Sequence, residues 1–560
     1  MPSELLLTIF ALAYQPSCIF SKSTCVTTNH SSPACSLPST RIRGRLLDER
    51  QGSRTAKVCD NWHDSPGILT ELDNVGPPCL NVAIETLSDD VLLEIFALCL
   101  NEDDFDPWYD PDDEYPYDAW YALAHVCQRW RYVVFASPRR LNLRLQCSSR
   151  RVREMLGVWP AFPIVIRDIV GFTPDEDNII AALEHRDRVC EIKLERLTIL
   201  QSEKLVPFMQ ESFPALTKLR IEAYHSISRG ESAPVLPNSF LGGSAPHLRS
   251  LCLSSLSFPT LPNLLLSASH LIHLDLSGIP SGFISLEMVN ALSALTKLEV
   301  MRLIFEYPDL DSHLEDPAPF PLTRSVLPAL TWLGLEGDGE YLNDFVARID
   351  VPSINFLEIA PTDRPFSVVD HFHLSQFIGR AENFNSLDYA AIELGYGGIN
   401  VHVSMQTLTP GCGVLKLQVL HSSEGPLPTL VQACNSSLLP LSNTQRLDIT
   451  TQYPDSHSRP KPDTGDTHWI DIFRLFSAAK SLSLGSMHIV PPVAFALKQV
   501  IEEGRSDVLP AIQKLSVSRS LPAGTVREAI EQFIIARGLT ALEKPGFSEW
   551  RFDAQDANDE

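Results

Sequence analysis

The sequence lacks the short motifs that identify most nucleotide-binding, hydrolytic and metal-dependent enzymes. It contains no P-loop, no G-x-S-x-G nucleophile motif, no H-E-x-x-H pair and no dinucleotide-binding glycine motif. "DHFH" (370–373) has two histidines at a spacing that suits one face of a strand, but a solvated edge is favoured over a metal site. "GYGG" (395–398) lacks a following lysine and is typical of a turn. The sequence therefore predicts a protein that is not an enzyme and that holds no metal and no cofactor.

Cysteine pairs of the metal-binding kind are also missing. Twelve cysteines are spread between Cys18 and Cys434, and no two of them form a C-x-x-C pair, which argues against a zinc site. Several, such as Cys99 and Cys127, lie inside apolar patterns, where a free cysteine acts as a small hydrophobic residue. This usage is typical of a reducing compartment, so the sequence predicts the cytoplasm, the nucleus or both as the location.

Basic residues are scarce: 45 lysines and arginines stand against 69 acidic residues, which gives a net charge of −24. Binding to nucleic acid, or to an anionic membrane surface, requires basic residues. The chain also lacks an uninterrupted apolar run of the roughly twenty residues that span a bilayer. The sequence thus predicts a soluble protein without a nucleic-acid or membrane partner.

What is present begins with a well-marked helix, "LSDDVLLEIFALC" (87–99). Ser88 is a good N-cap, and Asp89 and Asp90 place negative charge at the positive end of the helix dipole. The spacing i, i+3, i+4, i+7 predicts one apolar face, made of Leu92, Ile95, Phe96 and Cys99.

A second apolar stripe follows in "AWYALAHVCQRWRYVVFASPRRLNLRL" (119–145), and Pro138 ends any helix there. The stripe consists of Leu123, Val126, Cys127, Trp130 and Val134. Together the two stretches form a unit of about fifty residues, which carries more apolar surface than so small a unit can bury alone. Surplus apolar surface of this kind usually docks on a partner.

"LSDDVLLEIF…ALAHVCQRWRYVVFASP" resembles an F-box, a three-helix module with an acidic pair, an "LLxIF" helix and a later "VCRRW" helix. Two departures are Ser88 in place of the usual proline and an acidic insert (101–118), predicted to be a solvated loop, between the halves. The resemblance implies binding to the adaptor subunit of cullin–RING ubiquitin ligases and, through it, to the cullin. The residues that it implies for adaptor binding are Leu87, Leu92, Ile95, Phe96, Leu123, Val126, Cys127 and Trp130.

The first residues repeat part of this pattern. "MPSELLLTIFALA" (1–13) agrees with 87–99 at six positions, and "VCDNW" (58–62) resembles "VCQRW" (126–130). A secretory signal is disfavoured because the only early charge, Glu4, is negative. We interpret 1–80 as a disordered leader with a degenerate partial F-box-like copy. A decayed duplicate, an artefact of joined coding sequence and a chance match all remain open.

From about residue 185 the chain repeats an apolar residue followed by L-x-L. The phrases are "VCEIKL" (189–194), "LTKLRI" (216–221), "LRSLCL" (248–253), "LIHLDL" (271–276), "LEVMRL" (298–303), "LTWLGL" (330–335), "INFLEI" (354–359), "FNSLDY" (384–389), "GVLKLQVL" (413–420), "TQRLDI" (444–449), "AKSLSL" (479–484) and "IQKLSV" (512–517). The spacing of 23 to 35 residues resembles leucine-rich repeats, in which alternate leucines of short strands point inward and neighbouring repeats stack.

The predicted fold is therefore a small three-helix F-box module followed by an irregular leucine-rich-repeat solenoid. The expected boundaries are an F-box at 81–145, a linker or cap at 146–185, divergent repeats at 186–523, and a C-terminal cap helix with an acidic tail at 524–560. The sequence leaves the exact number and register of the repeats open, above all in 350–430. The alternative for the long C-terminal part is a compact α/β domain.

The resemblance implies a substrate receptor of a cullin–RING ubiquitin ligase, with the repeats holding an unknown target protein. A second hypothesis is a repeat scaffold whose F-box-like helices only cap the solenoid. A third, a secreted repeat protein, requires the opening segment to be a signal.

Overall fold

The structure is a computed structural model, and its described part divides into two compact units. The described residues are 87–100, 123–124, 126–138, 141, 143–146, 152–158, 160–167, 176–224, 233–279, 286–305, 324–362, 372–384, 386–395, 398–405, 413–420, 426–435, 439–451, 466–517 and 524–543. A helical unit contains α2 (Asp89–Leu100) and α4 (Gln128–Ala136), and a larger unit contains the chain from Ser137 onward. The leader with its F-box-like copy, the acidic insert (101–118) and the acidic tail (553–560) lie outside the described residues.

The helical unit begins as the sequence predicts. The Ser88 hydroxyl accepts a hydrogen bond from the Val91 amide at 3.4 Å, so Ser88 caps α2. Asp89 accepts two hydrogen bonds from the Arg129 guanidinium, at 2.7 and 3.0 Å, and these join the start of α2 to α4. Both side chains are largely exposed, so this pair contributes about 1 kcal/mol or less.

The second predicted stripe is interrupted, which corrects the expectation of a continuous helix face. The helix breaks at Cys127, and α4 starts at Gln128. The Cys127 sulfur accepts a hydrogen bond from the Trp130 amide at 3.4 Å, and so it occupies a capping position at the start of α4. The buried residues of this unit are Leu92, Leu93, Ile95, Phe96, Leu123, Ala124, Val133 and Val134.

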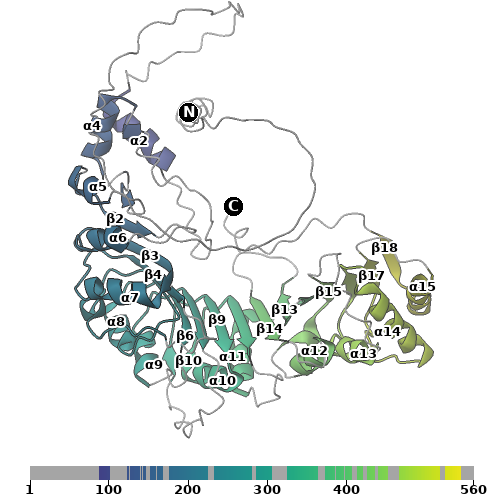
Figure 1. Cartoon of the computed structure of the whole chain (residues 1–560). Coiled ribbons are helices and arrows are strands. Elements are labelled where there is room, and N and C mark those ends of the chain that lie inside the picture. The colour runs from purple at the N-terminus through teal and green to yellow at the C-terminus, as the bar shows by residue number, and fades with distance from the viewer. Residues whose placement is uncertain are drawn as a thin grey trace, which may run out of the picture. The chain divides into compact units, whose positions relative to one another are not determined.

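The larger unit is a mixed α/β structure built on one 16-stranded, mostly parallel sheet (Figure 1). In sheet order the strands are β1 (Leu145–Gln146), β2 (Ile164–Arg167), β3 (Val189–Thr198), β4 (Lys218–Tyr224), β5 (Ser250–Ser254), β6 (His273–Ile279), β7 (Val300–Phe305), β9 (Trp332–Gly337), β11 (Phe356–Pro361), β14 (Val414–Leu420), β13 (Gly398–Ser404), β12 (Tyr389–Leu394), β15 (Arg446–Thr451), β16 (Ser481–Leu484), β17 (Lys514–Val517) and β18 (Thr540–Glu543). Two further strands, β8 (Ser325–Val326) and β10 (Ile349–Asp350), pair separately.

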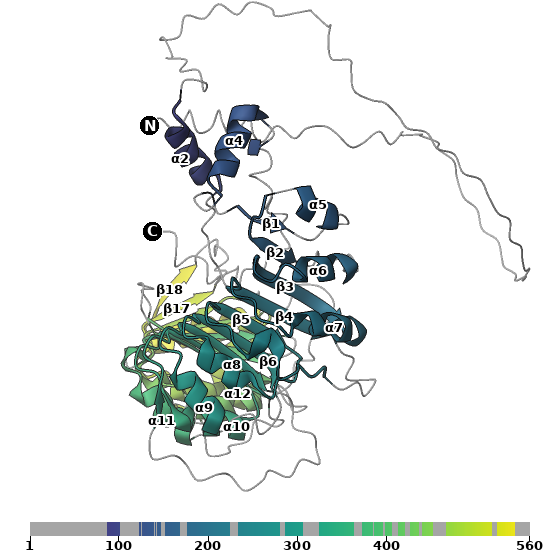
Figure 2. The same ribbon diagram turned by 90° about the vertical axis from the view of Figure 1, so that its left-hand side faces the viewer.

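Helices and short 3-10 turns connect the strands and lie on one side of the sheet; Figure 2 shows α6 and α7 on the same side of β2 to β4. They are α5 (Val152–Val158), α6 (Glu176–Leu183), α7 (Ile199–Leu205), η2 (Val206–Met209), η4 (Phe240–Gly243), α8 (Leu261–Ser267), α9 (Leu286–Ser293), α10 (Gly339–Arg348), α11 (Phe372–Arg380), η5 (Glu382–Phe384), α12 (Pro426–Asn435), η6 (Leu441–Asn443), α13 (Asp466–Leu475), α14 (Val490–Glu502) and α15 (Thr525–Arg537). None of these described helices is long and apolar enough to cross a membrane.

Each of the twelve L-x-L phrases ends in a strand, and the prediction that alternate leucines point inward is confirmed. Leu219, Leu251 and Leu274 stand opposite one another on β4, β5 and β6, and all three are buried. Between them, Arg220 and Cys252 point to the other face. Burying each leucine stabilises the fold by about 1.5–3 kcal/mol, and these rows run across the whole sheet.

The order of strands changes within 350–430, the region where the sequence leaves the register of the repeats open. The sheet order β11-β14-β13-β12-β15 shows that the chain passes over two positions after β11 and returns through the antiparallel strand β13. At the end of the β12–β13 hairpin the Gly395 amide donates to the Gly398 carbonyl at 2.9 Å. The two central residues of "GYGG", the predicted turn, lie outside the described residues. "FNSLDY" differs from the other phrases, since its strand begins only at its last residue, Tyr389.

A polar contact closes this rearranged segment. Asp448 on β15 is buried and accepts hydrogen bonds from the Tyr389 hydroxyl at 3.1 Å and from the Arg446 guanidinium at 2.9 and 3.1 Å. The Arg446 guanidinium also lies over the Tyr389 ring. These contacts tie β12 to β15, and thereby fix where the hairpin rejoins the parallel strands.

Four further expectations need correction. The stretch 146–185, expected as linker or cap, holds α5, β2 and α6, so the sheet starts well before the first predicted repeat. The boundary of the helical unit lies at Ser137 rather than at residue 145. His373 of "DHFH" lies on α11 rather than on a strand. The predicted C-terminal helix is present as α15, but β18 follows it and extends the sheet.

Candidate functional site

The eight residues implied for adaptor binding occupy three kinds of environment in the helical unit. Fully internal are Leu92, Ile95, Phe96 and Leu123. Leu87 and Trp130 are half-buried, and the Trp130 ring lies against the Phe96 ring with centroids 4.8 Å apart. Val126 and Cys127 are exposed, and the Val126 side chain is 58% accessible.

This arrangement corrects the expectation that all eight make direct contacts. A side chain inside the core has almost no surface to offer a partner, so the four internal residues act only by shaping the unit. Val126 is exposed although its spacing places it on the predicted stripe, and the helix breaks at the next residue, Cys127. Tyr132, at 71% accessibility, belongs to the same exposed group. Its position off the predicted stripe was the signal that could have identified it.

The larger unit presents a second candidate surface, the face of the sheet on which none of the described helices lies. We call it the helix-free face. It is formed by the strand residues that alternate with the buried leucines, and most of them are half-buried. Its residues come from many strands, so chemically distinct clusters lie side by side on one surface.

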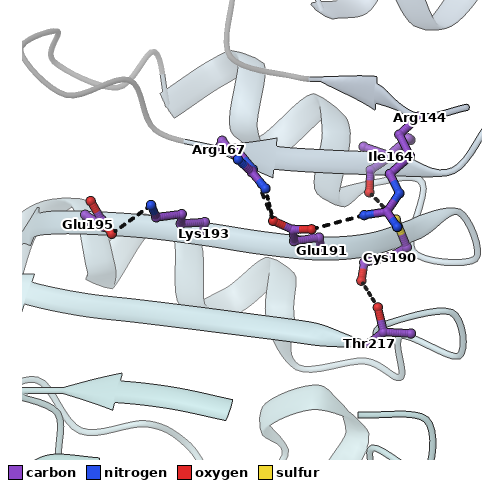
Figure 3. A network of polar contacts seen from close by, with 8 residues as sticks. All are labelled: Arg144, Ile164, Arg167, Cys190, Glu191, Lys193, Glu195 and Thr217. Carbon is purple, nitrogen blue, oxygen red and sulfur yellow. Dashed lines mark hydrogen bonds and ion pairs between the residues drawn. The ribbon is translucent and has the colours of Figure 1, made fainter. Parts of the chain in front are cut away.

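Glu191 on β3 is the centre of the first cluster (Figure 3). It is only 4% accessible. Its carboxylate accepts hydrogen bonds from the Arg167 guanidinium on β2 at 2.6 and 3.1 Å and from the Arg144 guanidinium at 3.3 Å. Two cations therefore approach its two carboxylate oxygens separately. Beside it, the Cys190 thiol lies 3.4 Å from the Ile164 carbonyl, and the Cys190 carbonyl accepts from the Thr217 hydroxyl at 3.0 Å.

A second carboxylate follows further along β3. Glu195 is also buried and lies 3.3 Å from the Lys193 ammonium and 3.0 Å from the Arg220 guanidinium on β4. Arg196, with φ of 54°, marks the bulge that displaces the register of β3 against β4 here. The bulge leaves Glu195 pointing to the helix-free face beside these two cations.

Positive charge exceeds negative charge in this part of the face. Burial lowers the pKa of the Lys218 ammonium; Glu191 opposes this effect, while Arg144 and Arg167 add to it. Burial, with Lys218 beside it, lowers the pKa of His273 to about 4. Desolvation is the main cause of both shifts, because burial disfavours the charged form of a lysine or a histidine, and the neighbouring cations are smaller causes.

The middle of the helix-free face is apolar. Trp332 on β9 and Phe356 on β11 are neighbours in register, and their rings are nearly parallel with centroids 5.3 Å apart. The Trp332 ring lies over Gly334, where an added methyl group would come within 2.6 Å of it. Val300 and Val414 extend the same row on the flanking strands, and all four side chains are half-buried.

Between these clusters lie groups of a kind that nucleophilic catalysis uses, but burial favours their protonated, unreactive forms. Burial raises the pKa of the Cys252 thiol to about 12, and it also raises the pKa of the neighbouring Asp275, an effect that Arg302 opposes. A thiol that stays protonated at neutral pH is a poor nucleophile. Among the described residues, no group of three or more His, Cys, Asp or Glu side chains is placed to hold a metal ion.

His402 on β13 leads to a prediction on pH. Burial lowers its pKa to about 4; Lys416 adds to this, while Glu393 and Glu358 oppose it. Since the unfolded value is near 6.5, the neutral form contributes stability that is complete above about pH 6.5 and is lost as the pH falls toward 4. We expect His402→Gln to reduce the drop in melting temperature between about pH 7 and 5. The same substitution at the exposed His247 is the control, and equal drops in wild type and His402→Gln would contradict the prediction.

No protein-family model matches this chain, and no curated protein matches its sequence. The F-box and leucine-rich-repeat resemblances therefore depend on the residues quoted above.

Proposed function

We propose that the chain is the substrate-receptor subunit of a cullin–RING ubiquitin ligase. Its helical unit is an F-box that docks the adaptor subunit, and its larger unit is a divergent leucine-rich-repeat solenoid that holds a target protein. The observation that carries the proposal is that some residues of "VCQRW" (126–130) are exposed while another packs on the core. Its first two residues, Val126 and Cys127, face outward, while Trp130 packs on the internal Phe96. A matched motif with an outward apolar edge and a closed core suits a docking module.

The larger unit supports the second half of the proposal. Its twelve phrases, spaced 23 to 35 residues apart, contribute strands to one sheet, with the connecting helices on one side. The other side presents a broad surface of charged, aromatic and aliphatic groups, which is what recognition of a protein requires. Such a receptor contributes proximity and orientation, and ubiquitin transfer is carried out by other subunits.

The test is a binding assay of the full chain with the purified adaptor subunit. We expect Val126→Glu to weaken adaptor binding at least about tenfold, because it places a charge at the centre of an apolar contact. The matched control is Val235→Glu in the larger unit, where Val235 is 64% exposed, and this variant should bind as wild type does.

Circular dichroism and the melting temperature establish that each variant is folded. If the folded wild-type chain does not bind the adaptor, the receptor proposal is wrong, and the scaffold hypothesis for the helical unit takes its place. If both glutamate variants bind equally well, the contact does not involve Val126.

A further inference from the structure

The helix-free face carries two distinct features on one surface. One is the row of apolar side chains centred on Trp332 and Phe356. The other is the charged cluster on β2, β3 and β4. Four strand spacings of about 4.8 Å separate β4 from β9, which puts Lys218 about 19 Å from Trp332 along the same row. About six extended residues bridge that distance.

The charged cluster on β2, β3 and β4 holds more cations than carboxylates. Its outward groups, together with Arg144, include five cations: Arg144, Arg167, Lys193, Lys218 and Arg220. Against them stand three carboxylates, Glu191, Glu195 and Glu222, of which the first two are buried beneath the cations. A chain with a net charge of −24 thus concentrates positive charge here. Burial is the main cause of the lowered pKa values of Lys218 and His273; the cations beside them lower these values by a smaller amount.

The aromatic pair has the character of an anchor site. Trp332 and Phe356 are half-buried on a sheet face, where a large aromatic side chain is not needed to fill the core. Aromatic residues of this kind, bordered by charged groups, dominate the energetics of protein interfaces. Around the pair lie Arg302 on β7 and the Lys416–Glu358 ion pair, whose charged atoms are 2.5 Å apart. The absence of a side chain at Gly334 leaves room for the Trp332 ring, which any side chain there would displace.

We propose that the helix-free face from β2 to β11 binds an acidic segment of the target protein, with carboxylates over the β2–β4 cluster and one apolar side chain on Trp332 and Phe356. This inference rests on the proposed function, since it names the class of target segment that the receptor holds. The excess of five cations over three carboxylates on β2 to β4 favours an acidic over a basic segment at that end. The proposal also requires an extended segment long enough to reach from one cluster to the other.

The experiment selects peptides on the purified full chain from a displayed random library of about sixteen residues, longer than the six that the distance requires. We expect the enriched peptides to carry an excess of Asp and Glu and an aromatic or aliphatic residue about six positions from them. The strongest peptide, labelled with fluorescein, is then titrated against variants. Trp332→Ala, Phe356→Ala and Gly334→Ala should each weaken binding about tenfold or more.

Matched controls lie away from this face. Leu266→Ala removes an exposed apolar side chain from α8, and Lys498→Ala removes a cation from α14; both should leave peptide binding unchanged. Lys193→Ala tests the charged cluster, and it should weaken binding at low salt and reduce the salt dependence.

The proposal is overturned if no peptides are enriched, if the enriched peptides are not acidic, or if their binding is unaffected at Trp332 and Phe356. It is also overturned if oligouridylate RNA binds as tightly with the same pattern of variants, because the face would then bind phosphate polyanions. Adaptor binding is measured on the same preparations. Peptide binding without adaptor binding would refute the receptor role alone, and adaptor binding without acidic-peptide binding would refute the present inference alone.

Discussion

A Glu191→Ala variant is expected to lose about 3–5 kcal/mol in the free energy of unfolding of the larger unit. The carboxylate of Glu191 is buried and neutralises Arg167 and Arg144 while opposing the desolvation of Lys218. Without this carboxylate, the partly buried cations Arg144, Arg167 and Lys218 lie close together and repel one another. The measurement is the denaturant-induced unfolding of the full chain, followed by a probe in the larger unit.

The pH dependence of this variant distinguishes charge repulsion from lost packing. Without Glu191 the pKa of Lys218 falls further, because Glu191 is the group that raises it. A lysine whose folded-state pKa is depressed contributes stability above its unfolded value, near 10.4, and loses it as the pH falls through the folded value. The deficit of Glu191→Ala should therefore shrink as the pH rises from about 7 toward about 10.

Glu336→Ala is the matched control, because this glutamate lies on the same face, 4.0 Å from Arg302, and both side chains are well exposed. Its removal should cost less than about 1 kcal/mol. A deficit of Glu191→Ala as small as that of the control would contradict the view that buried charge pairing holds β1 to β4 together.

Phe96→Ala should unfold the helical unit and leave the larger unit intact. Phe96 is completely buried and contacts Trp130, so its truncation costs about 3–5 kcal/mol. That is as much as the whole stability expected from the core of so small a unit. Hydrogen exchange on the full chain should show that the amides of α2 and α4 lose protection, while those of β5 to β7 keep theirs.

Tyr132→Ala provides the comparison, since Tyr132 lies on the same helix as Trp130 but is largely exposed, and protection in α4 should be retained. Adaptor binding should be lost in Phe96→Ala through unfolding. In Val126→Glu it should be lost without unfolding. Unchanged protection of α2 in Phe96→Ala would show that Phe96 does not hold the two helices together.

Features that depend on neighbours along the chain could be predicted from the sequence. The cap at Ser88, the helix that follows it and the inward leucines of the twelve phrases all follow from local spacing. A capping hydroxyl and a period of two are set by a few adjacent residues, so their signals survive in a single sequence.

Tertiary structure alone decided which strands became neighbours and which side chains met. No local signal shows that β14 pairs with β11 before β13 and β12 follow, because the three strands have similar apolar patterns. The contacts of Arg144 and Arg167 with Glu191, and of Trp332 with Phe356, join strands that are far apart in the sequence. Likewise, Val126 lies outside the core beside the break at Cys127, although its spacing placed it on the stripe. Spacing determines which face of an element a residue occupies. What lies opposite that face depends on the energy of packing the whole chain.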